Sequence, residues 1–104
     1  MMIDRIIEDC KKILQKHYGS KFHGLYLYGS MARGEAIESS DIDLLVLLSK
    51  PFNYFEELRV IIDHLYPIQL ESDHLISAKP VAKDEFDLGK IHLYRTVKRD
   101  GIAA

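Results

Sequence analysis

The sequence predicts one domain over residues 1–104 of the α/β class, in its α+β form, with a mixed central β-sheet and helices packed on one side. One observation is the length, because 104 residues are enough for one hydrophobic core and too few for two. A second is the composition, since 47% hydrophobic residues and a net charge of −2 are typical of a folded globular protein. The third is the pattern: amphipathic stretches of helical period alternate with short apolar runs, which gives the expected order α-β-α-β-α-β-α.

The first half of the chain begins with an amphipathic helix. Apolar residues recur at helical spacing over residues 3–14, and Gly19 is expected to end this helix. Residues 22–28 are predicted to form a strand, and residues 30–33 a short helical segment. Residues 41–48 are nearly all apolar, which predicts a strand in the middle of the sheet.

The second half continues with another amphipathic helix. Its apolar residues span positions 55–65, and Pro67 is expected to stop it because proline cannot continue the helical hydrogen bonding. Residues 68–81 are predicted to contain one or two further strands. A last helix is expected to open at Lys83, with Gly89 as a weak point inside it.

The connection between the first two predicted strands carries the most specific motif of the chain. Residues 29–43 have the sequence GSMARGEAIESSDID, in which ten residues separate Gly29-Ser30 from an Asp-x-Asp pair. Asp41 and Asp43 are two positions apart, so a strand would project both carboxylates from one face. Such a pair repels unless a proton or a cation lies between its members, and Mg²⁺ typically takes one or two protein carboxylates together with water and phosphate oxygens. The pair therefore predicts a site for one or two Mg²⁺ ions that handles phosphate.

Gly29 and Ser30 would supply the other half of such a site. A glycine lets the backbone approach a ligand closely, and free amides and the hydroxyl at Ser30 can receive phosphate oxygens. Arg33 follows one helical turn later and is a candidate phosphate contact, although a solvated surface arginine explains it equally well. A lone Asp-x-Asp is frequent in loops. The conjunction of the glycine-serine pair, the spacing, the aspartates and the flanking strands favours the metal and phosphate interpretation.

This conjunction resembles the signature of the DNA polymerase beta-like nucleotidyltransferase superfamily. The longer string GSMARGEAIESSDIDLLV resembles the minimal nucleotidyltransferase (MNT) branch, and residues 93–102 are similar to the usual end of that family. The resemblance implies the palm-like nucleotidyltransferase fold and a magnesium-dependent enzyme. It implies transfer of a nucleoside monophosphate from a nucleoside triphosphate, AMP from ATP, to an acceptor hydroxyl.

The resemblance also implies a partner. Many MNT proteins are antitoxins whose partner is an all-helical HEPN ribonuclease toxin, and in that setting the implied activity is adenylylation of the toxin on a tyrosine. A chain of 104 residues offers no base-reading domain, so the acceptor surface is expected to come from a second protein. The resemblance is compatible with a homodimer as well.

The superfamily's catalytic triad adds a third carboxylate, and no motif identifies it here. Asp73 stands beside the apolar pair Leu75-Ile76 and is the first candidate, and Glu71 is the second. A solvent-facing turn explains both residues equally well. If neither reaches the site, the alternative is a non-catalytic antitoxin that neutralises its partner by binding.

Several other classes of function are disfavoured. Cys10 is the only cysteine, so no intramolecular disulfide can form, and the five histidines are too scattered to indicate a zinc site. The net charge of −2 argues against direct nucleic-acid binding. Acidic residues near the start fit no secretory signal, and no apolar run is long enough to cross a bilayer, so no membrane association and a cytoplasmic location are expected.

Overall fold

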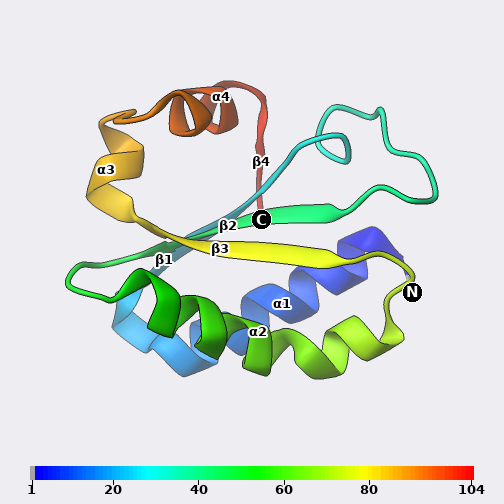
Figure 1. Cartoon of the computed structure of the whole chain (residues 1–104), viewed down its shortest axis with the longest axis horizontal. Coiled ribbons are helices and arrows are strands. Elements are labelled where there is room, and N and C mark those ends of the chain that lie inside the picture. The colour runs from blue at the N-terminus through cyan, green and yellow to red at the C-terminus, as the bar shows by residue number, and fades with distance from the viewer. Residues whose placement is uncertain (1) are drawn as a thin grey trace.

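The computed structural model describes residues 2–104 and builds them around a four-stranded mixed sheet (Figure 1). The elements are α1 (Ile3–Tyr18), a 3₁₀ turn (Gly19–Lys21), β1 (Phe22–Tyr28), β2 (Ile42–Leu48), α2 (Tyr54–Glu71), β3 (Ile76–Ala82), α3 (Lys83–Asp87), α4 (His92–Asp100) and β4 (Ile102–Ala103). The strand order is β3-β2-β1-β4, with β2 parallel to β3 and β1 antiparallel to both of its neighbours. The α+β class and the mixed sheet predicted from the sequence are confirmed.

Alternating residues of β2 face two different hydrophobic clusters. Leu44 and Val46 pack in the larger cluster, beneath which α1 and α2 lie side by side (Figure 1). Leu45 and Leu47 point the other way and pack with residues of β3, α3 and α4. The prediction of helices on one side therefore holds for the two long helices, whereas the short α3 and α4 cover part of the opposite face, where Phe86 and Val97 are buried.

Pro67 does not stop α2, which continues to Glu71. Residues 68–71 therefore belong to the helix, and of the one or two strands expected within residues 68–81 one is present, β3, which begins at Ile76. Proline in a helix interior costs about 3 kcal/mol. Pro67 lies on the exposed side of α2, where water can solvate the carbonyl that loses its partner, while the next residue, Ile68, is buried against the core. Burial of an isoleucine recovers about 1.5–3 kcal/mol, so packing carries the helix past the proline.

Two other predicted helices differ from the structure. Residues 30–34 form a hydrogen-bonded turn in place of a short helix. Where the sequence predicted one last helix, the structure has two, α3 and α4. The chain turns out of α3 at Gly89, whose φ is 63°, and the amide of Lys90 donates to the carbonyl of Glu85 at 3.0 Å. Short β4, which the sequence analysis did not predict, adds to the free edge of β1.

The strand boundaries place the predicted site residues at one end of the sheet. β1 ends at Tyr28 directly before Gly29, and β2 begins at Ile42 between the two aspartates. The face that Asp43 shares with Leu45 and Leu47 is the one only partly covered by α3 and α4, so the carboxylate stays accessible. None of the helices found in residues 2–104 is long and apolar enough to cross a membrane.

Candidate functional site

The chain leaves β1 through a tight turn. The amide of Arg33 donates to the carbonyl of Gly29 at 3.2 Å, and that of Glu35 donates to the carbonyl of Ser30 at 2.9 Å. Gly29 and Gly34 have φ angles of 77° and 72°, a region that residues with a Cβ rarely adopt. Met31 packs against the core from within the turn. The turn is therefore a fixed structure at the end of β1.

Gly29 lies directly against Asp43. A Cβ placed on Gly29 would overlap Oδ2 of Asp43, and Cγ of the same carboxylate would be 3.4 Å from it. The two halves of the sequence motif, separated by the ten-residue spacing, thus meet in space. A carboxylate beside an accessible glycine backbone is the juxtaposition expected of a site that holds phosphate and metal together.

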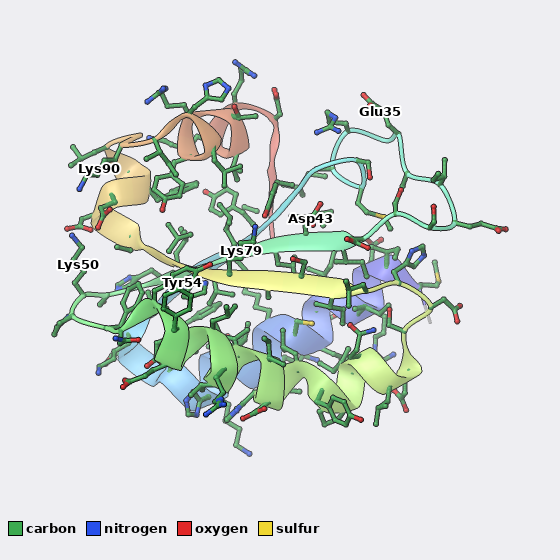
Figure 2. The ribbon with its side chains drawn as sticks, in the orientation of Figure 1. Glu35, Asp43, Lys50, Tyr54, Lys79 and Lys90 are labelled. Carbon is green, nitrogen blue, oxygen red and sulfur yellow. The ribbon has the colours of Figure 1, made fainter. Side chains whose placement is uncertain are left out.

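Asp43 points from β2 towards the partly open face of the sheet (Figure 2). In the register it pairs with Tyr28 on β1 and with Ser77 on β3. Burial raises the pKa of the Asp43 carboxyl, and the neighbouring Asp41 raises it further, while the positive charges of Lys79 and Arg33 oppose the shift. The direction of this shift is the one expected for neighbouring carboxylates.

Asp41 precedes β2 and is exposed. Its position is fixed on both sides: the carbonyl of Ser40 lies 2.7 Å from Nδ1 of His74, and the amide of Ile42 donates to the carbonyl of Leu75 at 2.8 Å. The loop before β3 therefore holds the beginning of β2 in place.

Asp41 and Asp43 fit a Mg²⁺ ion by the chemistry of their donors. Both are hard oxygen ligands, and Mg²⁺ commonly uses one or two carboxylates and takes its remaining oxygens from water and phosphate. Within residues 2–104 no group of three or more Asp, Glu, His or Cys side chains could hold a metal ion. Two protein carboxylates are within the number that Mg²⁺ takes.

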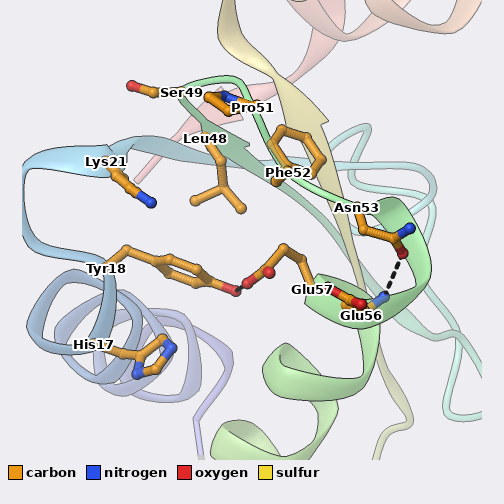
Figure 3. Close-up of a pocket in the computed structure, with 10 residues that line it drawn as sticks. All are labelled: His17, Tyr18, Lys21, Leu48, Ser49, Pro51, Phe52, Asn53, Glu56 and Glu57. Atoms are coloured by element: carbon orange, nitrogen blue, oxygen red, sulfur yellow. Dashed lines mark hydrogen bonds between the residues drawn. The ribbon is translucent and has the colours of Figure 1, made fainter.

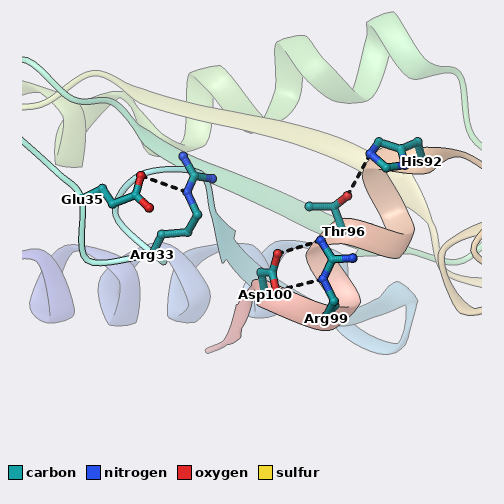
Figure 4. A network of polar contacts seen from close by, with 6 residues as sticks. All are labelled: Arg33, Glu35, His92, Thr96, Arg99 and Asp100. Atoms are coloured by element: carbon teal, nitrogen blue, oxygen red, sulfur yellow. Dashed lines mark hydrogen bonds and ion pairs between the residues drawn. The ribbon is translucent and has the colours of Figure 1, made fainter.

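Arg33 extends from the turn towards the same region. It pairs with Glu35 at 3.4 Å, and Figure 4 shows this pair close to the bidentate pair of Arg99 and Asp100. The hydrogen bond from Arg99 lowers the pKa of Asp100, and the charge of Arg33 contributes to the same shift. The charge of Arg33 also acts on Asp43, and its ion-pair partner Glu35 is exposed.

Glu71 and Asp73 lie outside this arrangement. Glu71 is the last residue of α2, Asp73 follows in the loop before β3, and both are exposed. Gln69 fixes that loop, because its Nε2 donates to the carbonyl of His74 at 3.0 Å and its Oε1 accepts from the amide of Ile76 at 2.7 Å. The structure does not join either carboxylate to the Asp41–Asp43 pair in a three-ligand group within residues 2–104. The assignment of Asp73 as the third catalytic carboxylate stays a prediction.

Sequence reasoning missed two residues at the site. Tyr28 lies opposite Asp43, and the pKa of its phenol is raised by burial first and by the charge of Asp43 second. Lys79 lies on β3, and its charge acts on Asp43. A lysine within a mostly apolar strand indicates a candidate functional residue. Placing it near Asp43 requires the register between β2 and β3, which the sequence does not give.

A separate cavity lies away from the two aspartates. It has a volume of about 470 Å³ and lies at the opposite end of β2, beside Leu48 (Figure 3). Polar groups line it, and Tyr18 donates to Glu57 across it at 2.9 Å. Neither Asp41 nor Asp43 is among the residues that line this cavity.

Comparison with known proteins decides the family. The family model described as polymerase beta, nucleotidyltransferase matches residues 8–96. The chain belongs to this family. It is thereby a nucleotidyltransferase. A candidate protein adenylyltransferase of Methanocaldococcus jannaschii is 38% identical over 81 residues, which cover 76% of this chain and 78% of the relative.

Solved structures share the fold. A spectinomycin adenyltransferase from Enterococcus faecialis, solved with ATP and spectinomycin, is 26% identical with a TM-score of 0.64, and the match covers 80% of this chain and 35% of that one. The toxin–antitoxin MntA-HpeT, solved as a mutant, is 20% identical with a TM-score of 0.56, and the match covers 93% of this chain and 70% of that one. At that identity the second likeness shows the fold alone.

Proposed function

We propose that this nucleotidyltransferase moves AMP from ATP to a hydroxyl of a partner protein, and that it acts as an antitoxin by adenylylating a HEPN ribonuclease toxin. The observation that carries the nucleotide site is the contact geometry of Gly29 and Asp43, which brings the two halves of the motif together. The protein acceptor is supported by the name of the 38% identical relative, a candidate protein adenylyltransferase. The toxin partner is supported by the likeness to a toxin–antitoxin structure and by the motif itself.

The residues of the site would have different roles in binding the nucleotide and the metal. The turn at Gly29 and Ser30 binds the β- and γ-phosphates through backbone amides and the serine hydroxyl, with Arg33 beside it. Asp41 and Asp43 hold the metal, and Mg²⁺, when bound, neutralises charge on the triphosphate. In the reaction, the acceptor oxygen forms a bond to the α-phosphorus, the bond between that phosphorus and the α–β bridging oxygen breaks, pyrophosphate leaves, and the acceptor proton passes to water. Positioning and electrostatics supply the catalysis.

The alternative is an antitoxin that neutralises its partner by binding alone. One observation favours it: residues 2–104 contain no third carboxylate grouped with Asp41 and Asp43. In that case the nucleotide site would bind Mg²⁺ and ATP without transferring AMP.

The test follows label from α-phosphate-labelled ATP, with Mg²⁺, into the proteins of a lysate of the source cells. The unmodified chain is compared with its Asp43→Ala variant. We expect one labelled band that only the unmodified chain produces, and mass spectrometry of that band identifies the acceptor residue. The binding-only antitoxin would be established by a different result. In that case the partner is present, stays unlabelled with every nucleoside triphosphate, and is still neutralised by the Asp43→Ala variant.

The same assay tests the third carboxylate. If Asp73 is that carboxylate, Asp73→Asn lowers labelling about as much as Asp43→Ala does. If labelling is unchanged, Asp73 is part of the loop only, and Glu71→Gln becomes the next variant to measure.

A further inference from the structure

We propose that Lys79 is a further substrate-binding residue, whose ammonium group contacts the α-phosphate of the nucleotide on the side from which the acceptor arrives. This inference rests on the proposed function, because it assumes a magnesium-bound nucleotide at Asp41 and Asp43. It assigns to β3 a positive group where the family resemblance leads one to expect a carboxylate.

The register of the parallel pair places Lys79 on the face of the site. Asp43 pairs with Ser77, Leu45 pairs with Lys79, and Val81 packs in the same cluster as Leu45. Because alternate residues of a strand share a face, the positions of β3 that look towards the nucleotide site are a serine, a lysine and a valine. Figure 2 labels Asp43 on β2 and Lys79 on the neighbouring edge strand β3.

Lys79 differs from the other lysines of this side of the molecule. Lys50 pairs with Glu85 at 2.7 Å, and Lys90 pairs with the same carboxylate at 3.6 Å. Lys79 is exposed and makes neither a salt bridge nor a side-chain hydrogen bond with any residue of the described chain, 2–104. Its charge nevertheless acts on the Asp43 carboxyl. No salt bridge joins the two groups, so the charged atoms of Lys79 and Asp43 are more than 4.0 Å apart. In the proposed complex an anionic phosphate oxygen lies between them.

The strand order gives the direction of the reaction. The turn at Gly29 and Ser30, which would hold the leaving phosphates, follows β1 on one side of β2, and β3 lies on the other side. Displacement at the α-phosphorus proceeds with the attacking and leaving oxygens roughly in line. The acceptor oxygen must therefore approach across β3, and a cation on that strand lies beside the phosphoryl group that is transferred. An ammonium group there would stabilise the charge on the phosphoryl oxygens without acting as a base.

The test is the affinity of two probes, ATP and inorganic pyrophosphate, measured by calorimetry in the presence of Mg²⁺. Lys79→Met is compared with the unmodified chain, with Lys79→Arg, and with Lys90→Met as the matched control. A hydrogen bond to a charged group contributes about 1.5–3 kcal/mol, so Lys79→Met should lower the affinity for ATP by about tenfold or more. Lys79→Arg should retain most of the affinity, Lys90→Met all of it, and pyrophosphate should bind all four proteins equally.

The outcomes separate this inference from the proposed function. If the unmodified chain binds no ATP, or binds it as well after Asp43→Ala, the proposed function fails, and this inference fails with it. If ATP binding requires Asp43 but is the same in Lys79→Met and Lys90→Met, only the role of Lys79 is overturned. If Lys79→Met lowers the affinity for ATP and for pyrophosphate equally, the assignment of Lys79 to the α-phosphate is overturned. Because Lys79 is exposed, thermal unfolding should show that Lys79→Met folds normally.

Discussion

Gly29 joins two requirements of the site at one residue. Its φ of 77° lets the chain turn directly after β1, and its missing side chain leaves space for the carboxylate of Asp43. Gly34 shares the first requirement without the second, since its φ is 72° but a Cβ there would meet nothing within 4 Å. Substitutions at the two glycines therefore distinguish two effects: both strain the backbone, but only a side chain at Gly29 crowds Asp43.

We expect Gly29→Ala and Gly34→Ala to lower stability by similar amounts, about 1–3 kcal/mol each, because both place alanine in the left-handed region. Only Gly29→Ala should also displace the Asp43 carboxylate, so nucleotidyl transfer should fall by at least about tenfold, as expected when a metal ligand is misplaced. Urea unfolding measures the first effect and labelled-ATP transfer the second. Equal transfer rates in the two variants would show that the close approach of Gly29 to Asp43 has no role.

Cys10 allows a prediction about pH. Its side chain is fully buried, and burial raises the pKa of the thiol to about 12, with a smaller contribution from Asp9. The folded protein therefore keeps a proton that the unfolded chain releases above about pH 9, and the resulting contribution to stability is intact below that pH and lost as the pH rises towards 12. The unfolding free energy should fall above pH 9, by at most about 1.4 kcal/mol per pH unit from this one group.

The comparison is with Cys10→Ala, whose stability starts lower because a cavity is left in the core. The measured quantity is the slope of the unfolding free energy against pH, which should be shallower in the variant. At pH 8 iodoacetamide should leave native Cys10 unmodified and should react once urea unfolds the protein. Parallel slopes in the two proteins would contradict the raised pKa of Cys10.

At the scale of elements, α2 is the helix in which packing overrides local preference. Pro67 removes one helical hydrogen bond on the exposed side, yet the helix continues so that Ile68 can be buried below it. Pro67→Ala should therefore restore the hydrogen bond and raise the unfolding free energy, by about 1–3 kcal/mol. Urea unfolding measures this directly. As a control, Tyr66→Ala changes an exposed neighbour and leaves the backbone hydrogen bonding intact, so it should have a smaller effect.

The same helix shows why part of the fold could not be predicted from the sequence. Local patterns placed β1 and β2 correctly, within one residue at Asp41, because their apolar runs are bounded by glycine and polar residues. They failed at Pro67, where a distant core decides the outcome, and at residues 30–34, where the turn depends on the positive φ angles of two glycines. The presence of helices on both faces also depends on long-range contacts, since Phe86 and Val97 are buried against residues of several strands, among them Leu45 on β2 and Val81 on β3.

Part of the candidate site could likewise be predicted from the sequence, and part could not. Gly29, Asp41 and Asp43 are predicted as site residues because a local motif contains all three, and the structure places Gly29 against Asp43. Lys79 could not be found, because its proximity to Asp43 depends on the parallel register of β2 with β3. The third carboxylate was sought along the sequence near Asp73, while the structure fixes only which residues of β3 face the site.

At the scale of the whole molecule, the site residues come from elements that fold together. The turn after β1 carries Gly29, β2 carries Asp43, and the loop held by Gln69 fixes the position of Asp41. A ligand that binds these segments at once binds the folded chain and not the unfolded one. Binding should therefore appear as a gain in global stability, whether or not AMP is transferred.

We expect ATP with Mg²⁺ to stabilise the protein against unfolding, by about 2.7 kcal/mol when free ATP is one hundred times its dissociation constant. For a domain of this size each kcal/mol raises the unfolding midpoint by about 4–8 °C, so the shift should be easy to measure by thermal unfolding. EDTA should remove it, because Asp41 and Asp43 then repel the triphosphate with no cation between them. Asp43→Ala should remove it as well, whereas Lys90→Met should keep it, since Lys90 pairs with Glu85 away from the site. An equal shift with and without EDTA would show that ATP binds independently of the aspartate pair, and the magnesium site proposed at β2 would be wrong.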